Sequence, residues 1–437
     1  MPQGLRILYP IVGDRDLTRF GGIFLIQRFC QKLKIRANLQ KMVPVDQHIR
    51  YYQPADMILG ILYALIVGFP RLRRTKVLRG NGVFQQIVGL DTYPHASSFR
   101  RFLKRTSPRT IQGITRLHDR LRQALFHLPR RRTGLLLDFD SSVLTVYGRS
   151  IECAKVGYNP HRHGARSYRP LLCFEAHTRE FWHGILRPGN LSDRMGAVPF
   201  LGECLAKIPR YIYRLRLRAD AGFYQRDFID ALEAAKIGYV IVAHLTTRLQ
   251  RRVAALRYHC FREGRAAAEL DYQPMGWKRP RRFVAIRHRL PEKETDQLCL
   301  FRTERHGYQV YVTNLKLRPE EVWHFYRRRA GVELDIRELK ESYALGRIPT
   351  NRYQANQVYF VLLLLAYDIV NWFRRLCLPP RFQTAAVGTI RDEFLALPAR
   401  LVKTDNRNVL RLPDGYVSQQ TVDQIIQRID RIKLGRL

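Results

Sequence analysis

At Gly134 the hydrophobic pattern of the sequence changes from the period of a helix to the period of a strand. Residues 135–139 form a short apolar run, and residues 171–176 and 181–186 form two more that are joined by a polar turn. Beyond them, expected helices at 195–207 and 227–235 alternate with expected strands at 211–220 and 238–244. Strands followed by alternating helices and strands describe a mixed α/β sheet, so we expect this class of fold from residue 134 onward.

The segments on either side of this region have other patterns. Residues 54–69 predict a buried helix, and residues 93–105 predict a basic amphipathic helix with a serine N-cap. That second helix fits the recognition helix of a helix-turn-helix unit about as well as an ordinary exposed basic helix. Residues 246–315 show short strands and no clear helix, which indicates an inserted β subdomain. One long helix at 319–343, a buried helix at 355–376, and then short helices and basic loops are expected after it.

The charge of the chain indicates a polyanionic partner. The 76 Lys and Arg residues exceed the 37 Asp and Glu residues by 39, and they are spread over the whole length. Arginine dominates runs such as 71–74, 130–132 and 279–282, and its planar guanidinium suits bidentate contact with phosphate. Nucleic acid is the commonest partner of such a surface, with an anionic membrane surface or mere solubility as the alternatives.

Cysteine usage and hydropathy indicate a reducing, aqueous compartment. The seven cysteines contain no CxxC pair and are widely scattered, which favours neither a disulfide framework nor a zinc module. The longest apolar run, at 358–367, is about half of what spans a bilayer, and the first nine residues lack the apolar core of a signal peptide. We therefore expect a soluble, cytoplasmic protein without a membrane partner.

Acids on apolar strands are the candidates for chemistry. In the strand that ends near residue 140, alternation places Asp138 and Asp140 on one face. A buried acid costs several kcal/mol unless it is paired or bound to a metal, so at least one of the two is expected to be functional. We favour Asp140, because Ser141 follows it at the expected strand end, and we expect Asp138 to be its supporting neighbour.

A second acid, Asp220, closes the strand expected at 211–220. Alternation places it on one face with Arg218, and Gly222 permits a tight turn into the next helix. The carboxyl end of a strand just before a helix is where α/β sheets place ligands. The alternative is that Asp220 caps the helix or pairs with Arg218.

A third acid lies on the helix expected at 319–343. At about 100° per residue, four side chains of this helix fall within an arc of roughly 60° along roughly 21 Å of axis: Tyr326, Arg329, Glu333 and Lys340. Taken alone, this stripe also fits a solvent-exposed face in which Glu333 forms ordinary ion pairs. Phosphoryl transfer needs charge neutralisation and a positioned nucleophile, which two metal ions about 4 Å apart supply when carboxylates hold them.

The spacing of these four residues resembles the Tyr-x2-Arg-x3-Glu-x6-Lys signature of the DDE transposases of bacterial insertion sequences. The segments 140–142, 157–160, 187–190 and 218–223 are similar to the other blocks of that family, in the same order. The resemblance covers residues 134 to about 376 and looks closest to the group named after insertion sequence 1380.

The resemblance implies an RNase H-like core with two aspartates on neighbouring strands and a glutamate on a later helix. On this basis we expect five segments: a helical DNA-binding region (1–130), the first part of the core (131–245), a β-strand insertion (246–317), the second part of the core with the glutamate helix (318–378) and a basic C-terminal region (379–437).

The resemblance also implies roles for individual residues. Asp140, Asp220 and Glu333 would bind two Mg²⁺ ions, for which Mn²⁺ substitutes, to cut double-stranded DNA at the ends of an element; the freed 3′ hydroxyl would then attack target DNA. Trp277 would stack on an extruded base, although a packing tryptophan fits equally well. The expected contacts to DNA are Tyr326, Arg329, Lys340, Trp277, His161, Arg162, Arg166 and Arg218.

Three points stay open in this interpretation. Two element ends imply a homodimer in the assembled complex, by analogy with the family. A host nuclease of the same fold and a domesticated DNA-binding protein without activity are the alternative functions. A zinc site built from Cys153 and nearby histidines fits no standard spacing.

Overall fold

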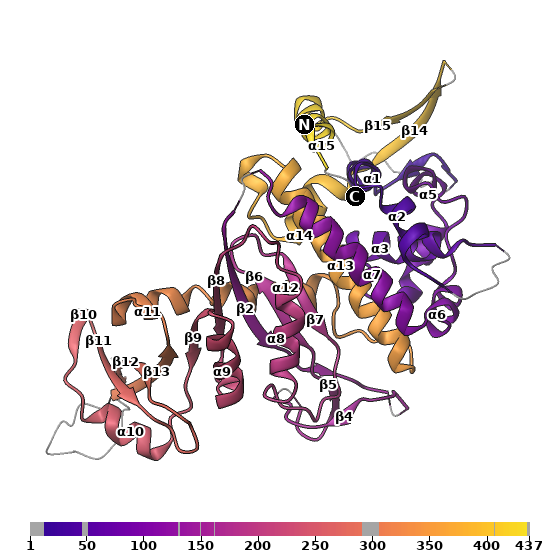
Figure 1. Ribbon diagram of the computed structural model, residues 1–437. Coiled ribbons are helices and arrows are strands. Elements are labelled where there is room, and N and C mark those ends of the chain that lie inside the picture. Colours follow the sequence, from indigo (N-terminus) through magenta and orange to yellow (C-terminus); the bar gives the residue numbers. More distant parts are fainter. Residues whose placement is uncertain are drawn as a thin grey trace, which may run out of the picture. The chain divides into compact units, whose positions relative to one another are not determined.

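The computed structural model describes residues 13–45, 51–129, 132–148, 150–160, 162–290, 306–405 and 407–434. The chain divides into two compact units (Figure 1). The first comprises 1–121, 342–350 and 354–437, and the second comprises 122–341 and 351–353. This division by contacts differs from the five segments expected along the sequence.

Helices make up most of the first unit. They are α1 (Ile23–Lys32), α2 (Ile35–Met42), α3 (Pro54–Ile66), η1 (Leu72–Thr75), α4 (Lys76–Arg79), α5 (Gly82–Val88), α6 (Ala96–Lys104), most of α7 (Pro108–Leu125) and most of α13 (Tyr353–Cys377). Nearly every residue of α13 is buried, as its apolar pattern predicts. None of the helices in the described residues combines the length and the hydropathy needed to cross a membrane.

Helix α6 is the basic amphipathic helix expected in this unit, but it starts before the serines that were expected to cap it. His95 is its N-cap and accepts a hydrogen bond from the amide of Ser97, so the serines lie inside the helix. Phe99 and Phe102 are buried, whereas Arg100 and Arg101 are exposed. The helix therefore shows a basic face to solvent.

The C-terminal part of the first unit contains strands where only short helices and basic loops were expected. A small antiparallel sheet has the order β1 (Leu17–Thr18), β14 (Ala399–Thr404), β15 (Arg407–Arg411), and the remaining elements are η3 (Pro380–Phe382), α14 (Val387–Ile390), η4 (Arg391–Leu395) and α15 (Gln419–Arg431). The hairpin was missed because most of its side chains are polar and exposed on both faces, which hides the period of a strand.

A nine-stranded sheet forms the centre of the second unit. Its order is β10 (His259–Arg262), β11 (Arg265–Tyr272), β12 (Arg281–Arg289), β13 (His306–Thr313), β9 (Gly238–Val242), β8 (Arg214–Ala219), β2 (Gly134–Ser141), β6 (Leu171–Glu175) and β7 (Phe181–Ile185). β8 runs parallel to both β2 and β9, and the other pairs are antiparallel. The predicted mixed α/β class is confirmed.

The two faces of β2 have different environments. Leu135, Leu137 and Phe139 belong to an apolar core that includes residues of α8 (Ala197–Leu205) and α9 (Arg226–Ala234). Because side chains alternate along a strand, Asp138 and Asp140 point to the opposite face. One face of the strand therefore anchors the sheet, while the other carries the acids.

The segment expected to be an inserted β subdomain extends this same sheet. β13 pairs with β9, with Tyr311 opposite Val242, and β12, β11 and β10 follow outward from it. The segment also contains a helix, α10 (Thr247–Ala254), where none was predicted. Only Leu249 and Val253 of α10 are buried, so its helical period has just two apolar members.

The long helix expected at 319–343 is two helices. α11 (Pro319–Arg327) and α12 (Ala330–Ser342) are separated at Arg328 and Arg329. A further three-stranded sheet, with the order β3 (Leu144–Thr145), β5 (Arg166–Tyr168), β4 (Lys155–Val156), also belongs to the second unit.

Candidate active site

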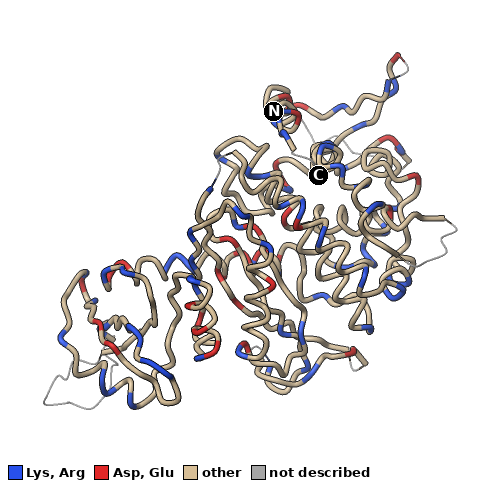
Figure 2. Tube along the Cα trace, viewed as in Figure 1, with Lys and Arg blue, Asp and Glu red and all other residues tan. Residues whose placement is uncertain are grey.

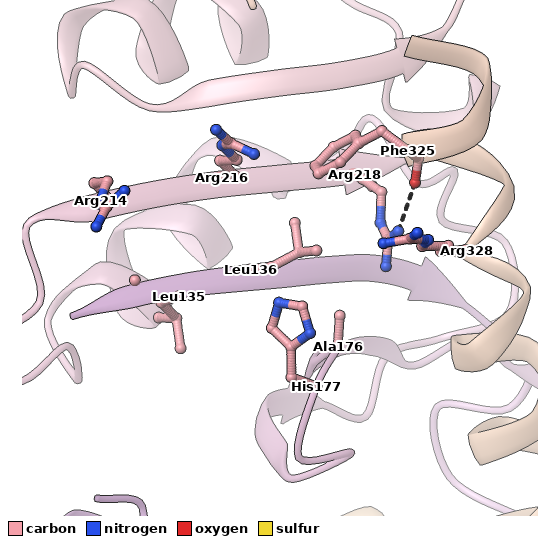
Figure 3. A pocket seen from close by; sticks show the side chains of 10 residues that line it. Leu135, Leu136, Ala176, His177, Arg214, Arg216, Arg218, Phe325 and Arg328 are labelled. Atoms are coloured by element: carbon pink, nitrogen blue, oxygen red, sulfur yellow. Dashed lines mark hydrogen bonds between the residues drawn. The ribbon is translucent and has the colours of Figure 1, made fainter. Parts of the chain in front are cut away.

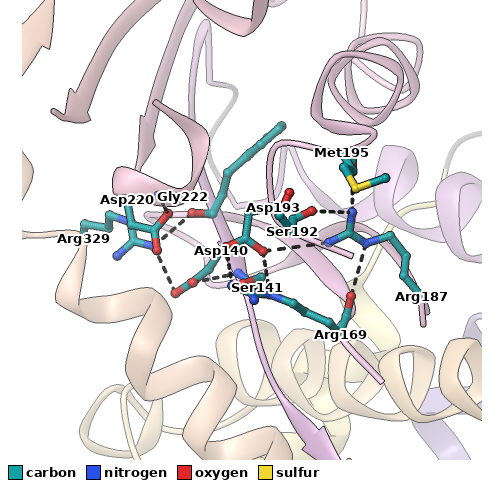
Figure 4. A network of polar contacts seen from close by, with 11 residues as sticks. Asp140, Ser141, Arg169, Arg187, Ser192, Asp193, Met195, Asp220, Gly222 and Arg329 are labelled. Atoms are coloured by element: carbon teal, nitrogen blue, oxygen red, sulfur yellow. Dashed lines mark hydrogen bonds and ion pairs between the residues drawn. The ribbon is translucent and has the colours of Figure 1, made fainter. Parts of the chain in front are cut away.

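Asp140 and Asp220 leave two neighbouring strands at the same level. β2 and β8 are parallel, and their register pairs Phe139 with Ala219, so each next residue is an aspartate. Adjacent strands lie about 4.8 Å apart, which brings the two carboxylates together at one edge of the ladder. The strand-end positions inferred from sequence therefore converge (Figure 4).

The Asp140 carboxylate is nearly enclosed. Its side chain is 12% exposed, the amide of Ser141 donates to Oδ1 at 2.7 Å, and Nη2 of Arg329 lies 3.0 Å from Oδ2. Burial raises the pKa of Asp140 to about 6; Arg329 opposes this rise, and the negative charges of Asp220 and Glu333 add to it. Arg329 therefore does not fully offset the effect of burial on the ionised form of Asp140.

Asp220 also caps a short helix, as one of the sequence alternatives proposed. Its Oδ1 accepts a hydrogen bond from the amide of Gly222 at 3.0 Å, at the start of η2 (Ala221–Phe223). A Cβ on Gly222 would lie 2.5 Å from Oδ2 of Asp193, so only glycine fits there. Burial raises the pKa of Asp220, Arg329 opposes the rise, and Asp193 adds to it.

Glu333 lies in the first turn of α12, with its side chain 66% exposed. An acid in the first turn is stabilised by the helix dipole. Its Oε1 is 3.7 Å from Nη1 of Arg329, and its charge acts on Asp140. One buried guanidinium therefore joins the third acid to the first.

Two other members of the predicted stripe lie beside these acids. Tyr326, in the last turn of α11, packs on Tyr311 with ring centroids 4.8 Å apart, and burial raises its pKa to about 12. Lys340, in the last turn of α12, is half-buried, and burial lowers its pKa while the charge of Asp140 opposes the change. The stripe is divided between two helices, yet its members still surround Asp140.

Two arginines hold the break between α11 and α12 against the sheet. Arg218 donates from Nη1 to the carbonyl of Phe325 at 2.7 Å, which satisfies a carbonyl in the last turn of α11. Arg329 donates from Nη2 to the carbonyl of Phe139 at 3.0 Å. These tertiary bonds, rather than a local helix-breaking signal, account for the divided helix.

Arg218 is better described as a structural residue than as the DNA contact expected from sequence. Its Nε and Nη2 each donate to Asp138 at 2.7 Å, and both side chains are 2% exposed. Asp138 is thereby paired with Arg218, whereas the direct ion pair of Asp140 is with Arg329. The register supplies the reason, since Asp138 and Arg218 are direct partners on β2 and β8.

A network on the other side of the carboxylates was missed by the sequence reasoning (Figure 4). Arg169 donates to both oxygens of Asp193, at 2.9 and 2.6 Å, and its Nε lies 3.4 Å from Oγ of Ser141. Nη2 of Arg187 is 3.8 Å from Asp193. Asp193 follows no apolar strand, so the pattern that identified Asp140 did not identify it.

The basic loop that follows β4 is only partly exposed. Arg162 and His163 are exposed, with the Arg162 guanidinium 5.5 Å from the ring of Tyr147, whereas His161 lies outside the described residues. Arg166 donates to the carbonyls of Ala154 at 2.8 Å and Ile151 at 3.1 Å. Arg166 therefore braces the loop from within, which leaves Arg162 and His163 as its described candidates for contact with DNA.

Trp277 lines a cavity of about 470 Å³. Its ring centroid is 5.3 Å from that of Tyr224, which in turn is 5.8 Å from that of His244. Tyr224, which lines the cavity, stands four residues after Asp220. Trp277 also packs against the core, which keeps both sequence interpretations in view.

The donor set suits hard divalent cations, because carboxylate oxygens are the ligands that Mg²⁺ prefers. The raised pKa values of Asp140 and Asp220 agree with a site that gains from added positive charge. Among the described residues, however, no three His, Cys, Asp or Glu side chains are close enough to hold a metal ion together. Arg329 supplies the positive charge between Asp140 and Glu333 instead.

Comparisons with known proteins identify a family and solved structures to which the chain is similar. The family described as Transposase DDE domain group 1 matches residues 11–434. Among solved structures, the chain is similar to the cryo-EM structure of the piggyBac transposase synaptic complex with hairpin DNA, with a TM-score of 0.44 and 10% identity over 97% of this chain and 89% of that chain. No curated protein matches.

Proposed function

Because the chain belongs to the transposase family with a DDE domain of group 1, we propose that it cuts DNA at the ends of a mobile element and joins the 3′ ends to target DNA. The observation that carries the proposal is that one buried arginine, Arg329, pairs with Asp140 and Glu333, while Asp220 follows the strand next to that of Asp140. The signature spacing from Tyr326 to Lys340 supports a place among the insertion-sequence transposases, in the group named after insertion sequence 1380.

In this mechanism Asp140, Asp220 and Glu333 would hold two Mg²⁺ ions, or Mn²⁺ in their place. Such ions would lower the pKa of an attacking water and offset charge on the scissile phosphate. The adjacent ends of β2 and β8 support this role for Asp140 and Asp220, whereas Glu333, which is exposed and 3.7 Å from Arg329, would have to turn inward. Arg329 then exchanges its carboxylate partners for phosphate oxygens next to the cut.

Tyr326 and Lys340 are the other two side chains proposed to bind the phosphates next to the cut. The Tyr326 hydroxyl is protonated at neutral pH, like that of any tyrosine, and burial raises its pKa further, to about 12, so it can act as a hydrogen-bond donor. Lys340 provides a cation that Asp140 already attracts. Both side chains thus present positive or donor groups to an incoming phosphate.

The Trp277 cavity receives an extruded base in this proposal. Its lining combines Trp277, Tyr224 and His244 with exposed arginines such as Arg226 and Arg248. Aromatic faces and guanidinium groups together are the surroundings in which unpaired bases stack. Tyr224 in this lining stands four residues after Asp220, which supports a place for such a base near the cut.

Basic surfaces elsewhere supply the remaining contacts with DNA. Lys and Arg residues are distributed over both units (Figure 2). The exposed face of α6, with Arg100, Arg101 and Lys104, suits the phosphate backbone of an element end, as does Arg162 in the second unit. Two ends held together call for two copies of the chain, so we include a homodimer in the proposal.

Glu333→Gln tests the proposal, with Glu341→Gln as the matched control. Both glutamates are exposed on α12, but only Glu333 acts electrostatically on Asp140. On labelled duplex that carries the element end, with Mg²⁺, we expect Glu333→Gln to bind normally and to lose cleavage and joining, while Glu341→Gln keeps all three. Cleavage without joined products in the wild type would assign a nuclease instead, and normal activity in Glu333→Gln would remove the third carboxylate from the site.

A further inference from the structure

A second cavity, of about 430 Å³, lies beside β2, β8 and the end of α11 (Figure 3). We call it the arginine groove and define it by Arg214, Arg216, Arg328, Phe325, Leu136 and His177, together with the buried Arg218 at its inner end. The described residues that line it include no Asp or Glu. The mechanism proposed above makes no use of it.

The groove has an excess of positive charge. Arg214, Arg216 and Arg218 are two residues apart on β8, so their side chains point to the same face. Asp138 neutralises Arg218, but within the part of the chain that the structure describes no carboxylate pairs with Arg214, Arg216 or Arg328. Arg216 instead lies over the ring of Phe325, with its guanidinium 5.7 Å from the ring centroid. Like charges in a concave surface attract an anion strongly.

The groove and Asp220 lie along the same strand. Asp220 follows β8 directly, and a strand advances about 3.3 Å per residue, so Arg216 precedes Asp220 by about 13 Å and Arg214 by about 20 Å. Arg328 is the neighbour of Arg329, which contacts Asp140. The arginines of the groove therefore lie on the same side of β8 as Asp220, toward the start of the strand, with the buried Arg218 between them.

We propose that the arginine groove binds the phosphodiester backbone of the DNA strand that runs away from the cut. This inference rests on the proposed function and adds a second contact region to the site. The arginines of β8 are spread along a line rather than pointing at one centre, which suits a chain of phosphates better than a single anion. Arginines two residues apart on β8 are about 6.6 Å apart along the strand. This distance is close to two steps of about 3.4 Å, the spacing of the phosphates of one DNA strand along the helix axis.

The salt dependence of DNA binding tests this proposal. The variant Arg214→Gln/Arg216→Gln removes two charges from the groove, and Arg251→Gln/Arg262→Gln removes two exposed charges elsewhere in the same unit. Each phosphate contact adds about 0.9 to the slope of log Kobs against log salt concentration on duplex DNA. We expect the groove variant to lose about 1.8 of the slope and the control variant to keep that of the wild type.

Methylphosphonate substitution locates the contact. Neutralising single phosphates on the strand that flanks the cut should weaken binding by the wild type at two adjacent or nearly adjacent positions, and should have no effect at those positions on the groove variant. Thermal unfolding of each protein checks that it is folded. If the double variant fails to fold, Arg328→Gln provides the same comparison for one charge, with an expected loss of about 0.9.

The outcomes separate this proposal from the one on which it rests. If the wild type and the groove variant bind DNA with the same salt-dependent slope, the proposal for the groove is wrong and the transposase proposal is unaffected. Equal losses in the groove and control variants would also overturn it, because the effect would be one of total charge. Absence of DNA binding by the wild type would overturn both. If inorganic phosphate binds the wild type but not the groove variant, while both proteins show the same salt dependence of DNA binding, the groove is a site for a single anion and the proposal is wrong.

Discussion

Asp138→Asn should destabilise the second unit while leaving the chemistry at Asp140 in place. In the folded protein Arg218 donates twice to Asp138, at 2.7 Å each, and both side chains are 2% exposed. The asparagine keeps the size of the side chain but removes its charge. The guanidinium then remains buried without a charged partner and loses one of its two acceptor oxygens at position 138, while the carbonyl of Phe325 stays in place.

The magnitude follows from this geometry. Removing one partner of a buried ion pair costs about 3–5 kcal/mol, because the other charge is left uncompensated. For a unit of 150–250 residues, each kcal/mol lowers Tm by about 2–4 °C, so the expected fall is about 6–20 °C. Asp138→Leu/Arg218→Met removes both charges with little change in volume and should recover most of this loss.

Thermal unfolding by calorimetry, with cleavage measured well below both transitions, checks the reasoning. We expect Asp138→Asn to cut DNA at a rate close to that of the wild type when it is folded, whereas Asp140→Asn should be inactive. An unchanged Tm in Asp138→Asn would refute the buried pair. A stable Asp138→Asn without cleavage would show that Asp138, rather than its neighbour two residues on, carries the chemistry.

Three further predictions concern the carboxylates and the aromatic cavity. Burial raises the pKa of Asp140 from 3.8 to about 6. The folded protein therefore holds this proton more tightly than the unfolded chain. The protonated group stabilises the fold fully below about pH 4, and this contribution to the free energy of unfolding is lost as the pH rises through 6. In chelator, Asp140→Asn should therefore gain about 3 kcal/mol relative to the wild type between about pH 4 and pH 8 in urea unfolding, and a constant difference would contradict the shifted pKa. Arg329→Gln removes the cation between Asp140 and Glu333, so Mn²⁺ should raise its Tm more than that of the wild type, and equal shifts would show that Arg329 does not compete with metal. Trp277→Ala should weaken binding of a DNA end by about 1–3 kcal/mol and Trp277→Phe by less; an abasic site at the extruded position should abolish the difference, and a difference that persists would assign Trp277 to packing.

The positions of two acids followed from local patterns. Apolar residues of β2 on the core side, such as Leu137 and Phe139, alternate with Asp138 and Asp140 because one face of the strand packs in the core. This alternation allowed the end of the strand to be predicted from the sequence. Asp220 was readable for a similar reason, since it stands between β8 and the turn that Gly222 allows. Chain-local periodicity carries this information because burial of one face determines it.

The remaining features depend on partners that are distant in sequence. Residues 319–343 have the composition of one continuous helix, and the break at Arg329 arises from bonds to Arg218 and to the carbonyl of Phe139. Arg218 looked like a DNA contact because its pairing with Asp138 depends on the register of β2 and β8, which no single strand encodes. The groove beside Arg216 was invisible for the same reason.

The extension of the sheet through β9 and β13 has a geometric consequence. Asp220 follows β8, and three strand-to-strand steps lead from β8 to β12, the strand that Trp277 precedes. Each strand is rotated by about 20–25° from its neighbour, so these steps turn the strand direction by about 60–75° and separate the two strands by about 14 Å. In the proposed function, a base extruded near Asp220 would therefore be received at an orientation that hydrogen-bonded strands, rather than a flexible linker, determine. The rigidity of the sheet would then decide how accurately the carboxylates and the aromatic cavity are aligned.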